Sequence, residues 1–198
     1  MLKKIVAIGP ESTGKSSLCT QLAQQYNTLW CPEYAREYLT VHGMNYTYED
    51  LLRIATGQIE LEEKYQSLVG ISEPGVKTTD DSRLPTAKSS LTIHPLLFID
   101  TDMYVMKVWC EYVFGKCHQY ILDQIVEREY DLYLLCNTDL PWTKDELREY
   151  PAEEPRKELY NIYEDILINQ TVPWVEISGK NEERLQKAIA AVDALIKV

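Results

Sequence analysis

The sequence has little positive charge for its length. In 198 residues, 20 Lys and Arg stand against 31 Asp and Glu, which gives a formal net charge of −11. A protein that binds nucleic acid through its phosphates needs a basic face, so this balance argues against nucleic acid as a partner. It does not exclude a small phosphorylated ligand, because one local basic site is enough to hold such a molecule.

The sequence also lacks a disulfide framework, a zinc motif and a long apolar run. Its five cysteines are widely spaced without a C-x-x-C pair, and its three histidines show no zinc-ligand spacing with them. Such cysteines are typical of reduced thiols, so we expect a cytoplasmic protein. The first apolar run, residues 5–8, leads into a glycine loop and predicts neither a signal peptide nor a membrane anchor.

Apolar residues are present in the amount that one domain core requires. They make up 45% of the chain, so we expect a single domain over residues 1–198. Strands are expected at 2–8, 28–31, 96–99, 132–136 and 174–177. Helices are expected at 16–26, 33–41, 48–68, 103–114, 118–128, 181–197 and 143–169, the last broken near Pro151 and Pro155. This alternation predicts a parallel α/β sheet with helices on both faces.

Residues 70–95 differ from the rest in composition. They contain three prolines and the polar run 77–82. A segment of this kind buries too little apolar surface to hold a fixed structure, so we expect a surface-loop insertion here.

A phosphate-binding motif follows the first expected strand. Residues 9–16, GPESTGKS, match G-x-x-x-x-G-K-[ST], and a helix is expected to follow, as the mechanism requires. In such a loop Lys15 reaches the β- and γ-phosphates and the Ser16 hydroxyl ligates magnesium. We therefore expect ATP, or a similar nucleoside triphosphate, and Mg²⁺ as cofactors. The expected nucleotide-binding residues are Gly9, Glu11, Ser12, Thr13, Gly14, Lys15, Ser16 and Ser17.

The motifs of a guanine-nucleotide switch are missing. Asp100 is followed by Thr101, Asp102 and Met103 without the glycine of D-x-x-G, and residues 137–139, NTD, lack the lysine of N-K-x-D. The sequence thus favours a phosphotransferase that acts on an alcohol group. A non-enzymatic ATP-binding regulatory module remains the alternative.

Acidic residues follow two of the expected strands. Glu33 comes after the second strand, and Asp100 and Asp102 come after the third. Ligands of open α/β sheets bind at the carboxyl ends of strands. Asp100 suits the magnesium shell, and either Glu33 or Asp102 suits the acceptor hydroxyl. The alternative is that each of these acids caps a helix.

The charged segment after the fourth strand has the place of a kinase lid. We expect a lid-like segment at 141–165, from which Arg148 closes over the transferred phosphoryl group. The alternative for Arg148 is a solvated helix, because several glutamates surround it. Trp142 is a candidate for stacking on a flat base, or else part of the core or pocket wall.

Four stretches together resemble a known family. They are GPESTGKSSL, PEYAREYL, LLFIDTD and LLCNTDLPWTKDELRE, and they resemble the bacterial ribosylnicotinamide kinases, the kinase domain of NadR-type proteins. The resemblance implies a P-loop nucleoside-kinase fold with sheet order 2-3-1-4-5. It also implies phosphorylation of nicotinamide riboside on its 5′-hydroxyl in NAD biosynthesis, with another nucleoside or small-metabolite kinase as the alternative.

The same resemblance extends the set of expected site residues. Catalytic roles are expected for Lys15, Glu33, Asp100 and Arg148, and substrate contacts for Glu33, Tyr34, Arg36, Asp102, Trp142 and Asp145. Because the phosphate loop begins at residue 9, we expect a kinase that stands alone, without the DNA-binding and adenylyltransferase domains of many family members.

Overall fold

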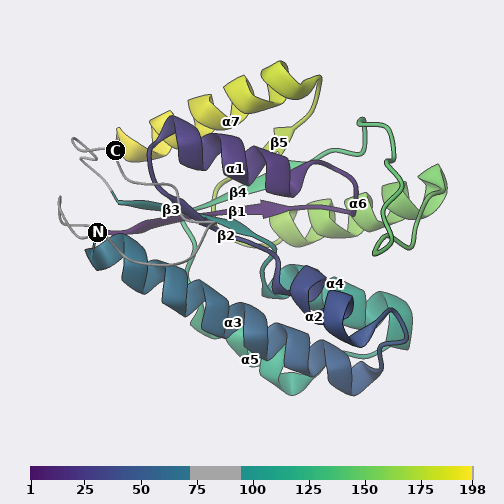
Figure 1. The fold of residues 1–198 in the computed structure, drawn as a ribbon. Coiled ribbons are helices and arrows are strands. Elements are labelled where there is room, and N and C mark those ends of the chain that lie inside the picture. The colour runs from purple at the N-terminus through teal and green to yellow at the C-terminus, as the bar shows by residue number, and fades with distance from the viewer. Residues whose placement is uncertain (72–94, 198) are drawn as a thin grey trace.

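Five parallel strands form one sheet in the order β2-β3-β1-β4-β5 (Figure 1). The computed structural model describes residues 1–71 and 95–197. The strands are β1 (Lys3–Ile8), β2 (Leu29–Cys31), β3 (Leu96–Asp100), β4 (Leu132–Cys136) and β5 (Trp174–Ile177). The helices are α1 (Lys15–Gln25), α2 (Tyr34–His42), α3 (Tyr48–Ile71), α4 (Met103–Phe114), α5 (Gln119–Glu127), α6 (Glu153–Ile168) and α7 (Asn181–Ile196). The expected fold class and strand order are confirmed.

Both faces of the sheet are buried because β1 and its neighbours are apolar on both sides. In β1, Ile5 and Ala7 pack with residues of α1 and α7. Val6 and Ile8 alternate with them and pack with residues of α4 and α6 on the other face. A strand that buries both faces carries a continuous apolar run, as the sequence shows. Figure 1 shows α1 and α7 on one side of the sheet and α6 on the other.

A second layer of helices lies beside the sheet. Residues of α2, α3, α4 and α5 form a separate apolar cluster around Leu51, Ile54, Met106 and Ile121. Helix α4 contributes residues both to this cluster and to the core beneath the sheet. Helix α4, which directly follows β3, is therefore packed on two sides. Its position places it next to the phosphate-binding loop.

The elements agree with the sequence patterns except near the expected lid. The strands begin and end within one residue of expectation, but residues 141–152 contain neither helix nor strand, and α6 begins only at Glu153. Pro155 does not break α6, because it lies in the first turn, where an N–H has no partner within the helix. Most of the expected insertion, 72–94, lies outside the described residues, while 70–71 belong to α3. No helix in the described part of the chain is long and apolar enough to cross a membrane.

Candidate active site

Two glycines shape the loop between β1 and α1. Gly9 has φ +139°, and a Cβ placed there would meet the carbonyl oxygen of Cys136 in β4 at 2.7 Å. Gly14 has φ +79° at the N-cap of α1. An L side chain is strained at such φ values, and at Gly9 it would also clash. The loop can therefore run against β4 and curl around the start of α1, where backbone N–H groups and the helix dipole favour a phosphate.

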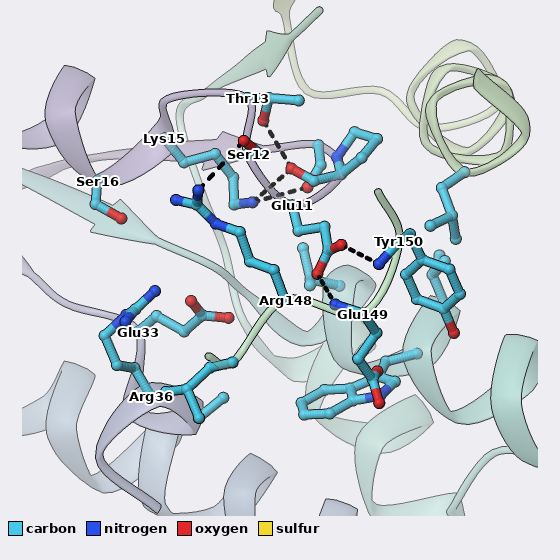
Figure 2. A pocket seen from close by; sticks show the side chains of 18 of the residues that line it. Glu11, Ser12, Thr13, Lys15, Ser16, Glu33, Arg36, Arg148, Glu149 and Tyr150 are labelled. Carbon is cyan, nitrogen blue, oxygen red and sulfur yellow. Dashed lines mark hydrogen bonds between the residues drawn. The ribbon is translucent and has the colours of Figure 1, made fainter. Parts of the chain in front are cut away.

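Lys15 and Ser16 lie on the cavity side of this loop (Figure 2). The Nζ of Lys15 donates to the carbonyl oxygens of Gly9 at 3.0 Å and Pro10 at 2.9 Å. The Ser16 hydroxyl donates to Oδ2 of Asp100 at 2.5 Å. Asp100 ends β3 and is 1% exposed. A hydroxyl and a carboxylate so close together fit Mg²⁺, which prefers oxygen ligands and takes few of them from the protein.

Burial sets the electrostatics of Asp100. Its desolvation raises the pKa of the carboxyl group, while the nearby charge of Lys15 and the hydrogen bond from Ser16 oppose that rise. A buried carboxylate of this kind is stabilised by a cation beside it, so the environment favours binding of a metal or of further positive charge.

One cavity of about 370 Å³ joins the loop to the helices beside the sheet. Among the residues expected at the site, the structure brings the P-loop residues, Glu33, Arg36 and Arg148 into its lining. The full lining is Gly9, Pro10, Glu11, Ser12, Thr13, Gly14, Lys15, Ser16, Ser17, Glu33, Ala35, Arg36, Leu39, Met44, Val105, Val108, Trp109, Tyr112, Leu147, Arg148, Glu149, Tyr150, Leu159 and Tyr163. The volume is that of a small-molecule site.

Of the two carboxylates expected to serve the acceptor hydroxyl, Glu33 is the one that lines this cavity. It stands at the N-cap of α2, yet its side chain makes no capping hydrogen bond within the described residues. Burial raises the pKa of Glu33, the charge of Asp100 adds to the rise, and Lys15 and Arg36 oppose it. A carboxylate with a raised pKa that does not serve as a cap suits the work of a general base.

Asp102 has a different position from Glu33, and its expected substrate contact stays a prediction. It is 1% exposed and is absent from the cavity lining. Its Oδ1 accepts from the N–H groups of Tyr104 at 3.0 Å and Val105 at 3.3 Å, so it caps α4. Its Oδ2 accepts from the Tyr133 hydroxyl at 2.9 Å. The helix-cap alternative is the one that the structure shows, and burial raises the pKa of Asp102 to about 6.

Three other expected substrate residues do not line this cavity. The Tyr34 ring packs on α3, where a Cβ at Gly57 would lie 2.1 Å from it. Asp145 forms an ion pair with Arg36 at 3.0 Å. Trp142 has an indole Nε1 that is buried without a hydrogen-bond partner in the described part of the chain. Tyr34 thus supports the α2–α3 packing and Asp145 holds Arg36, while the expected substrate contacts of all three residues stay predictions.

Helix α4 provides an aromatic wall of the cavity that the sequence motifs did not predict. Val105, Val108, Trp109 and Tyr112 line the cavity, and their spacing of three, four and seven residues places them on one face of the helix. The Nε1 of Trp109 donates to the hydroxyl of Tyr46 at 3.0 Å, which fixes the indole ring. Helical periodicity in a segment directly after Asp100 was the signal that could have identified this wall.

A family model described as an AAA domain matches residues 4–184. The chain belongs to this AAA domain family. It is similar to "Trifunctional NAD biosynthesis/regulator protein NadR" of Escherichia coli (strain K12), with 27% identity over 187 residues that cover 91% of the chain and 39% of the relative. The protein of the same name in Salmonella typhimurium is also 27% identical, over 89% of the chain and 38% of that relative. The chain thus spans about two fifths of the length of these relatives.

Solved structures share the fold of this AAA domain. A crystal structure of NadR protein in complex with NR matches with a TM-score of 0.72 and 21% identity, over 99% of the chain and 50% of that protein. Thymidylate kinase from Candida albicans matches with a TM-score of 0.59 and 16% identity, over 98% of the chain and 91% of the kinase. The AAA domain therefore has the fold of the P-loop kinases.

Proposed function

We propose that the protein is an ATP- and Mg²⁺-dependent kinase that phosphorylates the 5′-hydroxyl of nicotinamide riboside. The observation that carries the proposal is that one cavity joins a phosphate-binding loop to the carboxylate of Glu33 and the aromatic ring of Trp109. A kinase needs these parts together, because the donor phosphate and the acceptor hydroxyl must meet in one water-poor space. The similarity to the NadR proteins supports the choice of reaction.

In the proposed mechanism the chain positions both reactants and neutralises charge. Lys15 would leave the carbonyl groups of Gly9 and Pro10 and bind the β- and γ-phosphates. Glu33 would accept the hydrogen bond of the acceptor hydroxyl and take its proton as the γ-phosphoryl group transfers. Arg148 would stabilise the charge that develops on that group.

Ser16 and Asp100 would hold magnesium beside the phosphates. Bound Mg²⁺ neutralises phosphate charge and helps to orient the nucleotide. The residues themselves contribute a preformed pair of oxygens, 2.5 Å apart, at the start of α1 and the end of β3.

The cavity wall favours a flat, cationic acceptor. Trp109 and Tyr112 line it, and the carboxylate of Glu33 lies in the same lining. A positively charged pyridinium ring gains from an aromatic face and from nearby negative charge, whereas the neutral rings of uridine and cytidine gain only from stacking. These features support nicotinamide riboside over pyrimidine nucleosides.

The domain organisation belongs to the same proposal. Residues 1–198 form one kinase domain, with an insertion between α3 and β3 and a lid at 141–165. Four residues of that lid donate to Ser12 or Glu11 of the P-loop, namely Thr143, Arg148, Glu149 and Tyr150. Opening and closing of such a segment would admit the substrates and exclude water during transfer.

A comparison of acceptors tests the proposal. The kcat/KM for nicotinamide riboside should exceed the values for uridine, cytidine and deoxynucleosides by at least about 100-fold. Lys15→Ala protein serves as the control for contaminating kinases. A higher value for a pyrimidine nucleoside or a deoxynucleoside would overturn the acceptor assignment. Binding of ATP without turnover on any nucleoside would favour the regulatory module instead.

A further inference from the structure

The wall of the cavity opposite Glu33 is formed by a segment that has no regular structure. Residues 141–152, here called the covering segment, contain neither helix nor strand. Even so, they bring Arg148, Glu149 and Tyr150 into the cavity lining. A segment without its own backbone ladder keeps its position through the contacts that it makes with other parts of the molecule.

Glu11 of the phosphate loop makes the most specific of these contacts. Its Oε2 accepts from the N–H of Glu149 at 2.9 Å, and its Oε1 accepts from the N–H of Tyr150. Two consecutive backbone N–H groups thus share one carboxylate, and hydrogen bonds to an ionised acceptor are among the stronger ones in proteins. Figure 2 shows the Glu11 side chain turned towards the backbone of these two residues.

Ser12 adds to the same junction. Its hydroxyl oxygen accepts from the N–H of Thr143 at 3.0 Å and from the Arg148 guanidinium at 3.3 Å. The contacts with Glu11 and Ser12 therefore hold the segment on both sides of Leu147 and Arg148. The guanidinium of Arg148 lies beside Ser12 of the phosphate loop (Figure 2).

Electrostatics explain why the Glu11 carboxylate binds the covering segment and not the nucleotide. A carboxylate that faced the phosphates of ATP would repel them, because like charges at contact distance cost free energy even in a polar site. The carboxylate is instead occupied by N–H groups of the covering segment. Glu11 is expected in the nucleotide-binding loop, whose backbone N–H groups face the phosphates, and its side-chain carboxylate is bound to the covering segment.

We propose that Glu11 is a positioning residue that fixes the covering segment over the cavity and so places Arg148 at the transferred phosphoryl group. This inference rests on the proposed function, in that Arg148 acts on that group. The geometric part, in which Glu11 holds residues 149 and 150, does not depend on catalysis. The two parts can therefore be tested separately.

Amide hydrogen exchange tests the geometric part without any activity. In Glu11→Ala protein the amides of Glu149 and Tyr150 should exchange at least about tenfold faster than in the unchanged protein. Glu146→Ala, which removes an exposed carboxylate from the same segment, should leave them unchanged. Glu11→Gln conserves size and should give an intermediate rate, since its amide group offers one acceptor oxygen in place of two. Equal protection in all four proteins would overturn the proposal.

Kinetics and nucleotide binding test the catalytic part. Glu11→Ala should lower kcat about 10- to 100-fold, because a small misplacement of a charged group is costly in transfer. The Kd for ATP should stay within about threefold, since no phosphate contact is lost. The double variant with Arg148→Ala should be no slower than Arg148→Ala alone. A raised Kd with an unchanged kcat would make Glu11 a nucleotide contact and overturn the proposal, whereas a complete lack of kinase activity in the unchanged protein would overturn only the proposed function.

Discussion

The hydroxyl of Ser16 donates to Oδ2 of Asp100 at 2.5 Å, which joins the first turn of α1 to the last residue of β3. The two residues are 84 positions apart in the chain. Parallel strands β1 and β3 are neighbours, and their carboxyl ends therefore meet at the same edge of the sheet. This pair is the proposed magnesium site.

Asp100→Asn should raise the magnesium concentration needed for half-maximal activity by at least about tenfold and should lower kcat. The substitution removes the charge that favours the cation but retains an oxygen that can accept from Ser16. Magnesium titrations of both proteins at saturating ATP measure the effect. Asp123→Asn, an exposed aspartate in α5, is the matched control. Superimposable titrations of Asp100→Asn and the unchanged protein would remove Asp100 from the metal site.

Lys15→Ala should lower kcat at least about 100-fold and leave the Tm within about 2 °C. The lysine donates to two loop carbonyls in the cavity and would neutralise phosphate charge during transfer. Its removal deletes little packing, so folding should be preserved. Turnover and thermal melting are measured together, with Lys144→Ala, an exposed lysine of the covering segment, as the control. A folded variant with near-normal turnover would contradict the assignment of the phosphate loop.

The pH profile should report Glu33. Burial, with the charge of Asp100, raises the pKa of Glu33, so the loss of activity on acidification should begin above the usual range of a glutamate. The base works only when ionised, and kcat therefore rises with pH through that pKa. Glu33→Gln should lower kcat at least about 100-fold and remove this acid limb, whereas Glu37→Gln on the exposed side of α2 should keep it. Saturating magnesium is used so that Asp100 stays ionised. An unchanged profile in Glu33→Gln would exclude Glu33 as the base.

Asp102→Asn should alter stability and its pH dependence but not catalysis. Burial raises the pKa of Asp102 in the folded state from 3.8 to about 6, so its ionisation opposes folding once the pH rises through about 6. An asparagine is neutral and can still accept from the N–H groups of Tyr104 and Val105. The difference in free energy of unfolding, variant minus unchanged protein, should therefore increase by about 1–3 kcal/mol between pH 4 and pH 8.

Urea unfolding at several pH values measures that difference, and kcat/KM should stay within about threefold. A large loss of activity without a change in stability would return Asp102 to the substrate site.

Trp109→Leu should raise the KM for nicotinamide riboside about tenfold with little effect on the KM for ATP. The change removes the aromatic face from the cavity wall but keeps an apolar side chain. Trp142→Leu alters a tryptophan that does not line the cavity and should leave the acceptor KM near normal. The reverse pattern would show that the sequence-based choice of Trp142 was right.

The sequence alone determined most of the fold. The apolar run at 132–136 predicted β4 to the residue, because a strand buried on both faces is continuously apolar. The strand expected at 174–177 also matches the bounds of β5, although its Glu176 is exposed. The motif at residues 9–16 predicted the loop and the roles of its glycines, since few residues tolerate φ near +79° or +139°. The helix expected over 143–169 was wrong in its first ten residues, because charge and propensity do not reveal the hydrogen bonds of Thr143, Glu149 and Tyr150 to the loop.

Only the tertiary structure decided which acidic and aromatic side chains face the cavity. Glu33 and Asp102 both follow strands and both stand at helix N-caps. The carboxylate of Glu33 makes no capping hydrogen bond, whereas that of Asp102 accepts three hydrogen bonds. Trp109 rather than Trp142 lines the cavity because α4 is held between two apolar clusters, which fixes the rotation of its faces. Glu11 reaches Glu149 and Tyr150 across 138 and 139 residues of sequence. Contacts over such separations depend on how the chain packs in three dimensions, which local sequence patterns do not encode.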